Sequence, residues 1–260
     1  MNYLGLYTLY IKEVNRFINV YNQTLIAPLI NSMLLLAIFT LVFKNRVDFI
    51  EGVPFAQFMI PGLIMMTVIQ QAFANTSSTL TFSKVLGIII DMLIPPLSAK
   101  EIAIALPLAG ATRGVIAGIV VAVAVVILSL LFDSGMMLHI HHFGIMVFYM
   151  FSGALLLSLA GMIAGILSDS FDQMSAYTSF IITPLSFLSG TFYSINNLPE
   201  FWQHVNHFNP FFYIIDGFRY SLTGHNDFDI TTGVLFITGL NVVAYTAVYL
   251  MLKSGYRIKS

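Results

Sequence analysis

The chain has 260 residues, of which 58% are hydrophobic and 9% are charged, and its net charge is −1. Because soluble domains carry about 25% charged residues, this composition excludes a soluble enzyme and indicates an integral membrane protein with several spans. The near-zero net charge gives no support to a nucleic-acid partner, and the lack of cysteine excludes disulfides, thiolate nucleophiles and cysteine-based metal sites.

Residues 1–22 predict an amphipathic helix that lies in the membrane interface. Tyrosine and aliphatic side chains recur at helical spacing on one face, whereas Lys12 and Arg16 lie with polar residues mainly on the opposite face. The charges follow the apolar residues and no small-residue cleavage site is visible, so the segment does not resemble a signal peptide. The helix either only leads into the first span or also contacts a cytoplasmic partner.

Long apolar runs predict an all-α integral membrane fold, with one transmembrane domain over residues 1–260. A helix needs roughly 20 apolar residues to cross a hydrocarbon core of about 30 Å. By this measure the sequence predicts six transmembrane helices, at 25–43, 56–78, 102–132, 143–167, 176–194 and 231–252.

The third run is too long for one helix perpendicular to the membrane. Ser98 and Glu101 have the spacing of a capping box, which marks a helix start, while residues 114–132 alone are of spanning length. Pro107 and Arg113 therefore favour a helix that begins outside the hydrocarbon, with Arg113 near an interface. Small residues four or eight apart in the third and fourth runs predict close helix packing, within the subunit or between subunits, at Gly110, Gly114, Gly118, Gly153, Gly161 and Gly165.

Six spans place both termini on one side of the membrane. With segments 1–24, 79–113, 168–175 and 253–260 on that side, eight of the eleven Lys and Arg residues lie there and three lie on the other. Cytoplasmic loops carry the excess of Lys and Arg, so both termini are predicted to be cytoplasmic.

The segment between the second and third spans predicts a docking element. Its short apolar helix ends at two prolines before it could cross the membrane, and apolar side chains exposed to cytoplasm require a cover of lipid headgroups or protein. We interpret 84–97 as a helix and loop that contact a partner, and an interfacial loop without a partner is the alternative. The candidate residues are Lys84, Leu86, Ile89, Ile90, Asp91, Leu93, Pro95 and Pro96.

Motifs for chemistry are scarce. No lysine follows a glycine, so a Walker A phosphate loop is absent. The cluster His139, His141 and His142, with Asp133 upstream, lacks a second cluster of ligands, and we predict no metal site. The spans hold no paired central carboxylates and the two halves show no repetition, which weakens the alternative of a secondary transporter. A membrane enzyme acting on lipid, through the histidine loop or residues 204–220, is the other alternative.

Residues 196–221 predict a re-entrant helical hairpin in the outer leaflet. Two short helices, 200–206 and 211–221, are broken by Asn209 and Pro210, and neither is long enough to cross. Both neighbouring spans end on the outside, so the pair is expected to dip into the leaflet and return. Irregular backbone at that depth requires protein or water around it.

Several ordered motifs carry a family resemblance. They are Ala27-Pro28, Ile60-Pro61-Gly62, Ile94-Pro95-Pro96-Leu97, Pro184, Leu188-Ser189-Gly190, Phe192-Tyr193, Leu198-Pro199, Asn209-Pro210, Tyr213, Asp216 and Arg219. In these motifs the chain resembles the permease subunits of type-2 ABC exporters over essentially its whole length. The segment 82–94 departs from the family pattern, since it carries fewer charges than expected of a coupling helix.

The resemblance implies a six-span permease of the bacterial inner membrane that has no nucleotide site or cofactor of its own. Such a permease pairs as a dimer among membrane lipids and binds two copies of a separate ATP-binding subunit, which holds ATP and Mg. ATP-driven closure would push the 84–94 helix and the amino-terminal helix, and a substrate would move outward. The family exports drugs, lipids and polysaccharide precursors, and the sequence does not select among these.

The resemblance also assigns a substrate path or outer gate to the hairpin. Its candidate residues are Gly190, Pro199, Trp202, Asn209, Pro210, Tyr213, Asp216 and Arg219. Asp216 and Arg219 lie three apart on one helical face, and an unpaired arginine at that depth is costly, so we predict a polar partner for Arg219. The family resemblance favours a gate, and a structural plug is the alternative.

Overall fold

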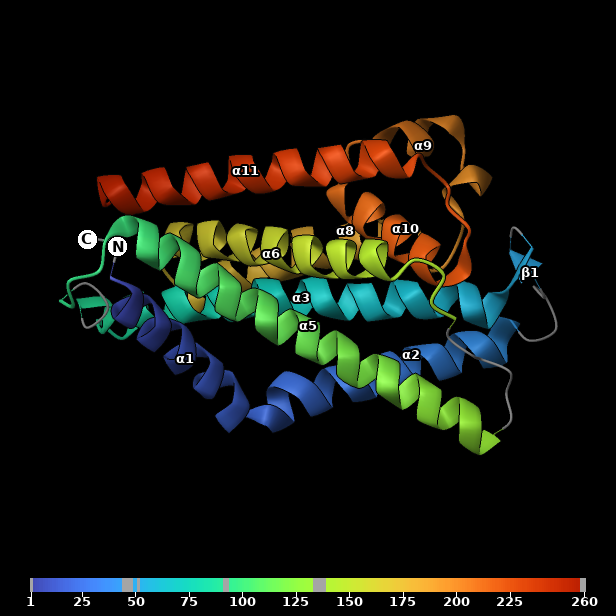
Figure 1. Ribbon diagram of the computed structural model, residues 1–260, viewed down its shortest axis with the longest axis horizontal. Helices are drawn as coiled ribbons and strands as arrows, with labels where there is room; N and C mark the ends of the chain where they lie inside the picture. The colour runs from blue at the N-terminus through green and yellow to red at the C-terminus, as the bar shows by residue number, and fades with distance from the viewer. Residues whose placement is uncertain (1, 44–48, 51, 91–93, 133–138, 258–260) are drawn as a thin grey trace.

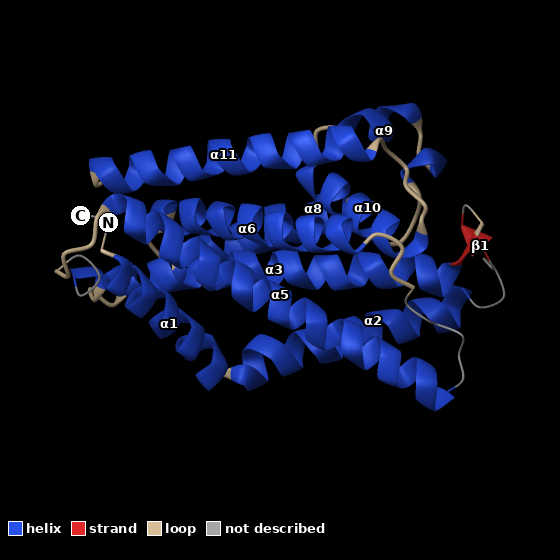
Figure 2. Ribbon diagram, viewed as in Figure 1, coloured by secondary structure: helices blue, strands red, loops and turns tan. Residues whose placement is uncertain are grey.

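The computed structural model describes residues 2–43, 49–50, 52–90, 94–132 and 139–257. Within these ranges nearly all regular structure is helical (Figure 2), as the long apolar runs predict. The described exception is an antiparallel pair of two-residue strands, β1 (Phe49–Ile50) and β2 (Val53–Pro54), in which Phe49 lies opposite Pro54.

Five segments in the described part of the chain are long and apolar enough to cross a bilayer. One of them joins a π-helical segment, Asn22–Ile26, to a regular helix. They correspond to five of the six predicted spans, and the fourth span begins and ends at the predicted residues. The five helices are α2 (Ala27–Phe43), α3 (Phe55–Val85), α5 (Ala99–Phe132), α6 (Phe143–Leu167) and α11 (Ile230–Ser254).

The remaining predicted span, 176–194, is built from three consecutive helical segments. These are α7 (Phe171–Tyr177), a π-helical segment (Thr178–Ile182) and α8 (Thr183–Leu188). Together they would extend about 27 Å at the usual rise per residue. Helix formation ends before residue 194, and Gly190, with φ of +74°, adopts the left-handed conformation that follows many helices. A sixth crossing stays a prediction.

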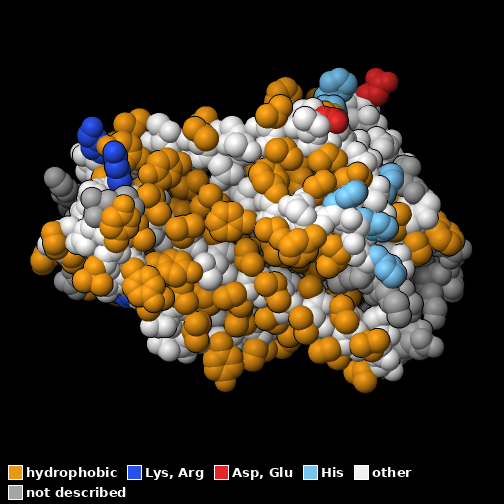
Figure 3. Space-filling model, viewed as in Figure 1, with side chains coloured by type: hydrophobic (Ala, Val, Ile, Leu, Met, Phe, Trp, Pro, Cys, Tyr) orange, Lys and Arg blue, Asp and Glu red, His pale blue; other side chains and the backbone are white. Residues whose placement is uncertain are grey.

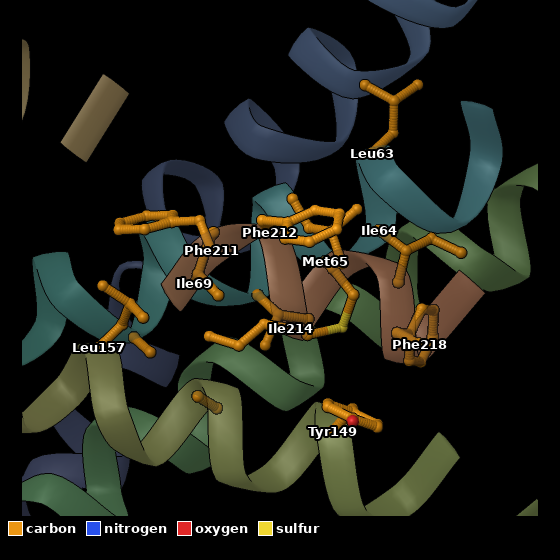
Figure 4. Close-up of a cluster of buried hydrophobic side chains, with 14 of the residues drawn as sticks. Leu63, Ile64, Met65, Ile69, Tyr149, Leu157, Phe211, Phe212, Ile214 and Phe218 are labelled. Carbon is orange, nitrogen blue, oxygen red and sulfur yellow. The ribbon is translucent and has the colours of Figure 1, made fainter. Parts of the chain in front are cut away.

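Helix α3 forms the centre of the bundle. Figure 1 shows it beside α6, with α5 crossing it, while α11 runs along α6. Figure 4 shows Met65 and Ile69 of α3 and Tyr149 of α6 in one buried cluster with Phe212 and Ile214 of a short helix near the carboxyl terminus. All five side chains are buried. Burial of this kind stabilises the fold through close packing, because lipid provides no hydrophobic force between helices.

The glycines of α5 and most of those predicted to pack in α6 face α3, whereas Gly153 faces Ile214. A Cβ atom at Gly114 would lie 2.5 Å from the carbonyl oxygen of Val68, and a Cβ at Gly165 would lie 3.0 Å from that of Ser77. Only glycine permits such close approach of the backbones. The two predicted packing ridges therefore lie within the subunit.

The start of α1 (Tyr3–Asn19) and the end of α11 lie at one end of the bundle, here called the terminus end (Figure 1). The opposite end, where α6 begins, is the far end. Along α1, Asn2 donates its backbone N–H to Glu101, whereas the Tyr10 hydroxyl lies 2.9 Å from that of Thr112. Helix α1 thus runs alongside α5 in the direction of the far end. Its predicted interfacial position stays a prediction.

Helix α5 begins with the predicted capping box. Glu101 Oε2 accepts a 2.7 Å bond from the Ser98 backbone N–H, and the Glu101 N–H lies 3.4 Å from Ser98 Oγ. The helix then continues through Pro107 without a break. Arg113 lies near its middle and donates Nη2 to Gln71 Oε1 at 2.6 Å, and its predicted position near an interface stays a prediction.

The predicted hairpin contains a 3-10 turn (Ile195–Asn197), α9 (Glu200–Asn206) and α10 (Pro210–Thr223). The two helices differ in burial. Phe201 and Trp202 of α9 are exposed, whereas nearly every residue of α10 is buried against α3, α6 and α11. The two short helices are therefore as predicted, and their depth in a membrane stays a prediction.

Candidate functional site

Local sequence fixes both ends of α10. Asn209 precedes the helix, and its Oδ1 accepts a 3.0 Å bond from the Phe211 N–H, while Pro210 occupies the first turn. The helix ends at Gly224, whose φ of +73° is left-handed. These signals place Asp216 and Arg219 on the buried part of a rigid helix.

Arg219 is fully buried and has the polar partners predicted for it. Its Nη2 donates to the Gly190 carbonyl at 2.5 Å, and its Nε donates to the Phe58 carbonyl at 3.3 Å. The guanidinium carbon also lies 3.8 Å from the centre of the Phe58 ring, a cation–π contact. Arg219 therefore joins three segments of the chain: α10, the start of α3, and the turn after α8.

Asp216 bonds mainly the backbone of the turn before α11. Its carboxylate accepts bonds from the N–H groups of Asp227 at 2.9 Å and Phe228 at 3.1 Å. Arg219 Nη1 faces the same carboxylate at 3.7 Å without a hydrogen bond. The Asp227 carboxylate in turn accepts from Ser194 Oγ at 2.9 Å. We call Phe58, Gly190, Asp216, Arg219 and Asp227 the far-end cluster.

The other predicted gate residues divide into two groups. Tyr213 donates its hydroxyl to the His207 carbonyl at 3.0 Å, and Asn209 Nδ2 donates to the Leu185 carbonyl at 3.3 Å, so both hold α10 in place. Pro199 and Trp202 instead lie at the start of exposed α9. The hydrogen-bond partners described for the cluster belong to the chain itself.

At the terminus end, Lys84 caps a neighbouring helix. Its Nζ donates to the carbonyls of Ile166 and Ser168, each at 2.8 Å, and to Asp169 Oδ1 at 2.9 Å. The ammonium group thus satisfies the carbonyl end of α6, where a positive charge is favoured. Because its side chain is 9% exposed, Lys84 itself offers little surface to a partner.

The loop after α6 carries an ion pair that the sequence did not reveal. Hydrogen bonding to Lys84 lowers the pKa of Asp169 below its usual range. Arg257, from the end of the chain, lies 3.5 Å from the same carboxylate and donates to the Leu167 carbonyl at 2.9 Å. Residues 168–175 include no lysine or arginine, so the loop's own sequence does not indicate this pairing.

The predicted docking segment exposes apolar side chains. Ile90 is 59% exposed and Ile94 is 74% exposed, whereas Ile89 packs against the core. Asp91 and Leu93 lie outside the described residues. We call Leu86, Ile88, Ile90 and Ile94 the terminus-end patch.

Beside this patch is an apolar cleft of about 290 Å³. It lies between the segment Pro95–Leu97 and the first turns of α1, with Leu4 and Leu9 among its lining residues. The docking segment and the amino-terminal helix therefore share one surface.

The matches to known proteins agree with these features. A family model described as ABC-2 type transporter matches residues 5–223. The chain belongs to this family. The inner membrane transport permease YadH of Escherichia coli (strain K12) is 33% identical over 258 residues, covering 99% of this chain and 98% of YadH. Nodulation protein J of Rhizobium meliloti (strain 1021) is 37% identical over 73 residues, covering 28% of each chain.

Membership of the ABC-2 family confirms the resemblance seen in the sequence. Such a chain is a transport subunit without enzymatic activity of its own, and the family implies an ATP-binding partner subunit. The full-length relative is an inner membrane protein, which agrees with the apolar helices of this chain.

The histidine loop has a structural role in the described chain. The backbone N–H groups of His141 and His142 donate to the Ser221 carbonyl at 2.9 and 3.1 Å, and the His142 ring stacks on Tyr220. Among the described residues, no group of three or more His, Asp or Glu side chains is placed to hold a metal ion.

Sequence reasoning missed a polar network between α1 and α3. Arg16 Nε lies 3.0 Å from the buried carboxylate of Glu13, and Arg16 Nη2 donates to the Asn75 carbonyl at 3.1 Å and to the Thr79 hydroxyl. The polar face of α1 therefore meets polar residues of α3. The signal available was the run of five polar residues at 75–79, at the end of the second predicted span.

Proposed function

We propose that this chain is the membrane-spanning subunit of an ATP-driven exporter, with its ATP-binding partner docked on the terminus end. The terminus-end patch carries the proposal, because four large aliphatic side chains on one short segment require a cover. The neighbouring cleft, lined by α1, gives the partner a second contact. Two copies of the permease with two ATP-binding subunits would complete the transporter.

Charge supports placing the terminus end in the cytoplasm. On the face shown in Figure 3, Lys and Arg lie at the terminus end and His lies at the far end. Loops that stay in the cytoplasm carry the excess of Lys and Arg. The described cations of this end are Lys12, Lys84, Lys100, Lys253 and Arg257.

In this orientation the chain crosses the membrane six times. The helical segments 171–188 form the fifth crossing, which is short and reaches the far end near Gly190. Helices α9 and α10 then lie in the outer leaflet, with α10 covered by α3, α6 and α11. The cover satisfies the rule that broken helices at membrane depth are surrounded by protein.

Helix α3 links the two functional ends. It holds Lys84 at the terminus end and Phe58 in the far-end cluster, about 39 Å apart at 1.5 Å per residue. Movement of the docking segment would therefore shift the Phe58 carbonyl away from Arg219 and open the far end for substrate release. In this proposal the far-end cluster is an outer gate whose closed state is held by Arg219, and ATP and substrate each favour one state.

Docking is tested by placing a charge in the patch. Ile90→Glu should prevent recovery of the ATP-binding subunit with the tagged permease from membranes, since burying an unpaired carboxylate in an apolar contact is costly. Ile140→Glu is the matched control, because Ile140 is 55% exposed at the far end. Normal recovery of the ATP-binding subunit with Ile90→Glu, or equal loss in both variants, would contradict docking at the patch.

The dimer is tested separately. Exposed apolar residues on α2 and in 171–188, including Leu34 and Phe180, offer a face for a second copy. Cysteines introduced at Leu34 and Phe180, in a chain that has none, should give disulfide-linked dimers in membranes. Cross-linking confined to Val243 on α11, which is also exposed, would place the second copy elsewhere.

A further inference from the structure

Two arginines from different helices approach one stretch of α3. Arg16 of α1 donates Nη2 to the Asn75 carbonyl at 3.1 Å and lies 3.4 Å from Asn75 Oδ1. Arg113 of α5 donates Nη2 to Gln71 Oε1 at 2.6 Å. Because Gln71 and Asn75 are one turn apart on α3, three helices bring cationic and amide groups to one place.

Positive charge at this place exceeds negative charge. Glu13 balances Arg16 through the ion pair between them. No carboxylate in the described ranges lies within ion-pair distance of Arg113. An uncompensated arginine inside a membrane bundle is costly and marks a functional site by default.

The same place holds unused hydrogen-bond donors. Asn75 is 1% exposed, and its Nδ2 group has no acceptor. Arg113 Nε is also buried without one. Buried donors in native structures nearly always have partners, so these two groups require an explanation. A ligand that supplies several oxygen acceptors and negative charge would satisfy both.

The depth of the site indicates where such a ligand comes from. Ser32, the central residue of the apolar segment 22–42, lies 2.8 Å from Thr67 through their hydroxyls, so Thr67 marks the mid-height of the bundle. Gln71 and Asn75 lie about 6 and about 12 Å from it toward the terminus end. Half of the hydrocarbon core is about 15 Å thick, so the site lies in the terminus-end half of the core, about 3 to 9 Å inside its boundary.

The site also has access to the surface of α3. Between Phe58 and Thr81 only Gln70, Gln71, Ala74 and Ser78 are not buried, and these lie on one face. Gln70 and Gln71 line a small polar pocket of about 60 Å³ between α2 and α3. A headgroup that reaches Arg113 would therefore find polar side chains next to it.

We propose that Arg16, Asn75 and Arg113 bind the phosphate headgroup of an anionic amphiphile. Phosphate matches the site because its oxygens accept bonds from several donors at once, and guanidinium groups bind it with charge-assisted bonds. Taken with the proposed export function, on which this step rests, the amphiphile is the substrate and enters from the cytoplasmic leaflet.

The test is a binding titration on the purified permease in the neutral detergent dodecyl maltoside, with binding measured by calorimetry. Dodecyl phosphate is the probe, and dodecylphosphocholine, which has the same chain and phosphate but no net charge, is the comparison. Wild-type protein should bind dodecyl phosphate at least tenfold more tightly than dodecylphosphocholine. Inorganic phosphate tests the source: displacement of the probe at millimolar concentration assigns the site to a soluble anion, and failure to displace it assigns the site to a lipid.

Variants locate the site. Arg113→Gln should weaken binding of dodecyl phosphate about tenfold or more, since one charge-assisted bond is lost. Asn75→Ala keeps every charge and should weaken binding about threefold to tenfold, which tests the site even if Arg113→Gln fails to fold. Arg257→Gln, which removes an arginine at the terminus end, is the matched control and should bind as wild type.

Three results would overturn the proposal: equal affinity for the two amphiphiles, wild-type binding by both Arg113→Gln and Asn75→Ala, or equal weakening in Arg257→Gln. Because the titration contains no ATP-binding subunit, its failure would leave the docking experiment on Ile90 unaffected. Normal recovery of the ATP-binding subunit with Ile90→Glu, together with intact phosphate binding, would overturn docking at the patch instead.

Discussion

Two arginines inside the bundle, Arg219 and Arg113, differ in every respect except their charge. Arg219 is fully buried, bonds two backbone carbonyls, lies over an aromatic ring and faces a carboxylate. Arg113 is half-buried, bonds one amide oxygen, faces no described carboxylate and keeps a buried donor unused. A membrane protein bears the cost of a buried arginine either for a fixed contact or for a ligand.

This difference in partners predicts that one arginine mainly stabilises the fold and the other mainly binds a ligand. The partners of Arg219 belong to the chain itself: two carbonyls, an aromatic ring and a carboxylate surround the guanidinium group, and only Nη1 lacks a hydrogen bond. Arg113 has a single hydrogen-bond partner, Gln71, and no carboxylate beside it in the described part of the chain. We therefore expect loss of Arg219 to affect mainly folding and the closed state, and loss of Arg113 to affect mainly what the protein binds.

The largest effect is expected from Arg219→Met. Methionine keeps much of the length but leaves the Phe58 and Gly190 carbonyls without their donor and Asp216 without its cation, so the free energy of unfolding should fall by about 3–5 kcal/mol. Unfolding in mixed micelles can be followed by the fluorescence of Trp202, the sole tryptophan. Unchanged stability together with lost transport would show that Arg219 acts on the substrate and does not hold the fold.

Asp216→Asn should have a smaller effect. The amide keeps one acceptor, but its NH₂ group would face one of the two backbone donors of Asp227 and Phe228, and the charge opposite Arg219 is lost. The free energy of unfolding should fall by about 1–3 kcal/mol. Asp229→Asn, at the start of α11, is a control that alters an exposed cap without touching the far-end cluster.

The sequence predicted the elements around Arg219 but not its partners. Asn209-Pro210 indicated the start of α10, and the long apolar runs indicated α3 and α6 with accurate bounds for α6. Every residue has a carbonyl, so nothing in the sequence distinguishes Phe58 or Gly190 as acceptors for an arginine 161 and 29 residues away. The need for a partner was predictable from membrane energetics, whereas its identity depends on tertiary packing.

Lys84 illustrates the same limit at the terminus end. Its position after an apolar run suggested an anchor for docking, whereas the fold directs its ammonium group to the carbonyl end of α6. Periodicity describes contacts within a segment, and this contact joins residues more than 80 apart in the chain. Helix ends near Gly190 were also mispredicted, because a left-handed glycine is not distinguishable from a helical one in an apolar run.

Lys84→Met tests this cap and should lower the free energy of unfolding by about 1 kcal/mol near neutral pH. The effect should depend on pH, because the folded-state pKa of Asp169 is lowered beside Lys84. A carboxylate whose pKa is lower in the folded than in the unfolded state stabilises the fold at pH values above its unfolded-state pKa, about 4. This stabilisation is lost as the pH falls through the folded-state pKa. The difference between variant and wild type should therefore narrow in acid, and a difference independent of pH would contradict the role of the ion pair.

The smallest effect on stability is expected from Arg113→Met, the same substitution as at Arg219. Removing Arg113 stabilises the fold by eliminating a charge that has no carboxylate partner, and it destabilises the fold by leaving Gln71 Oε1 without its donor. Because the two effects oppose each other, the free energy of unfolding should change by less than about 1 kcal/mol. Unfolding followed by Trp202 fluorescence, beside Arg219→Met in the same micelles, gives the comparison directly. If both substitutions destabilise the protein equally, Arg113 is a fixed contact like Arg219, and the distinction between a structural and a binding arginine does not hold.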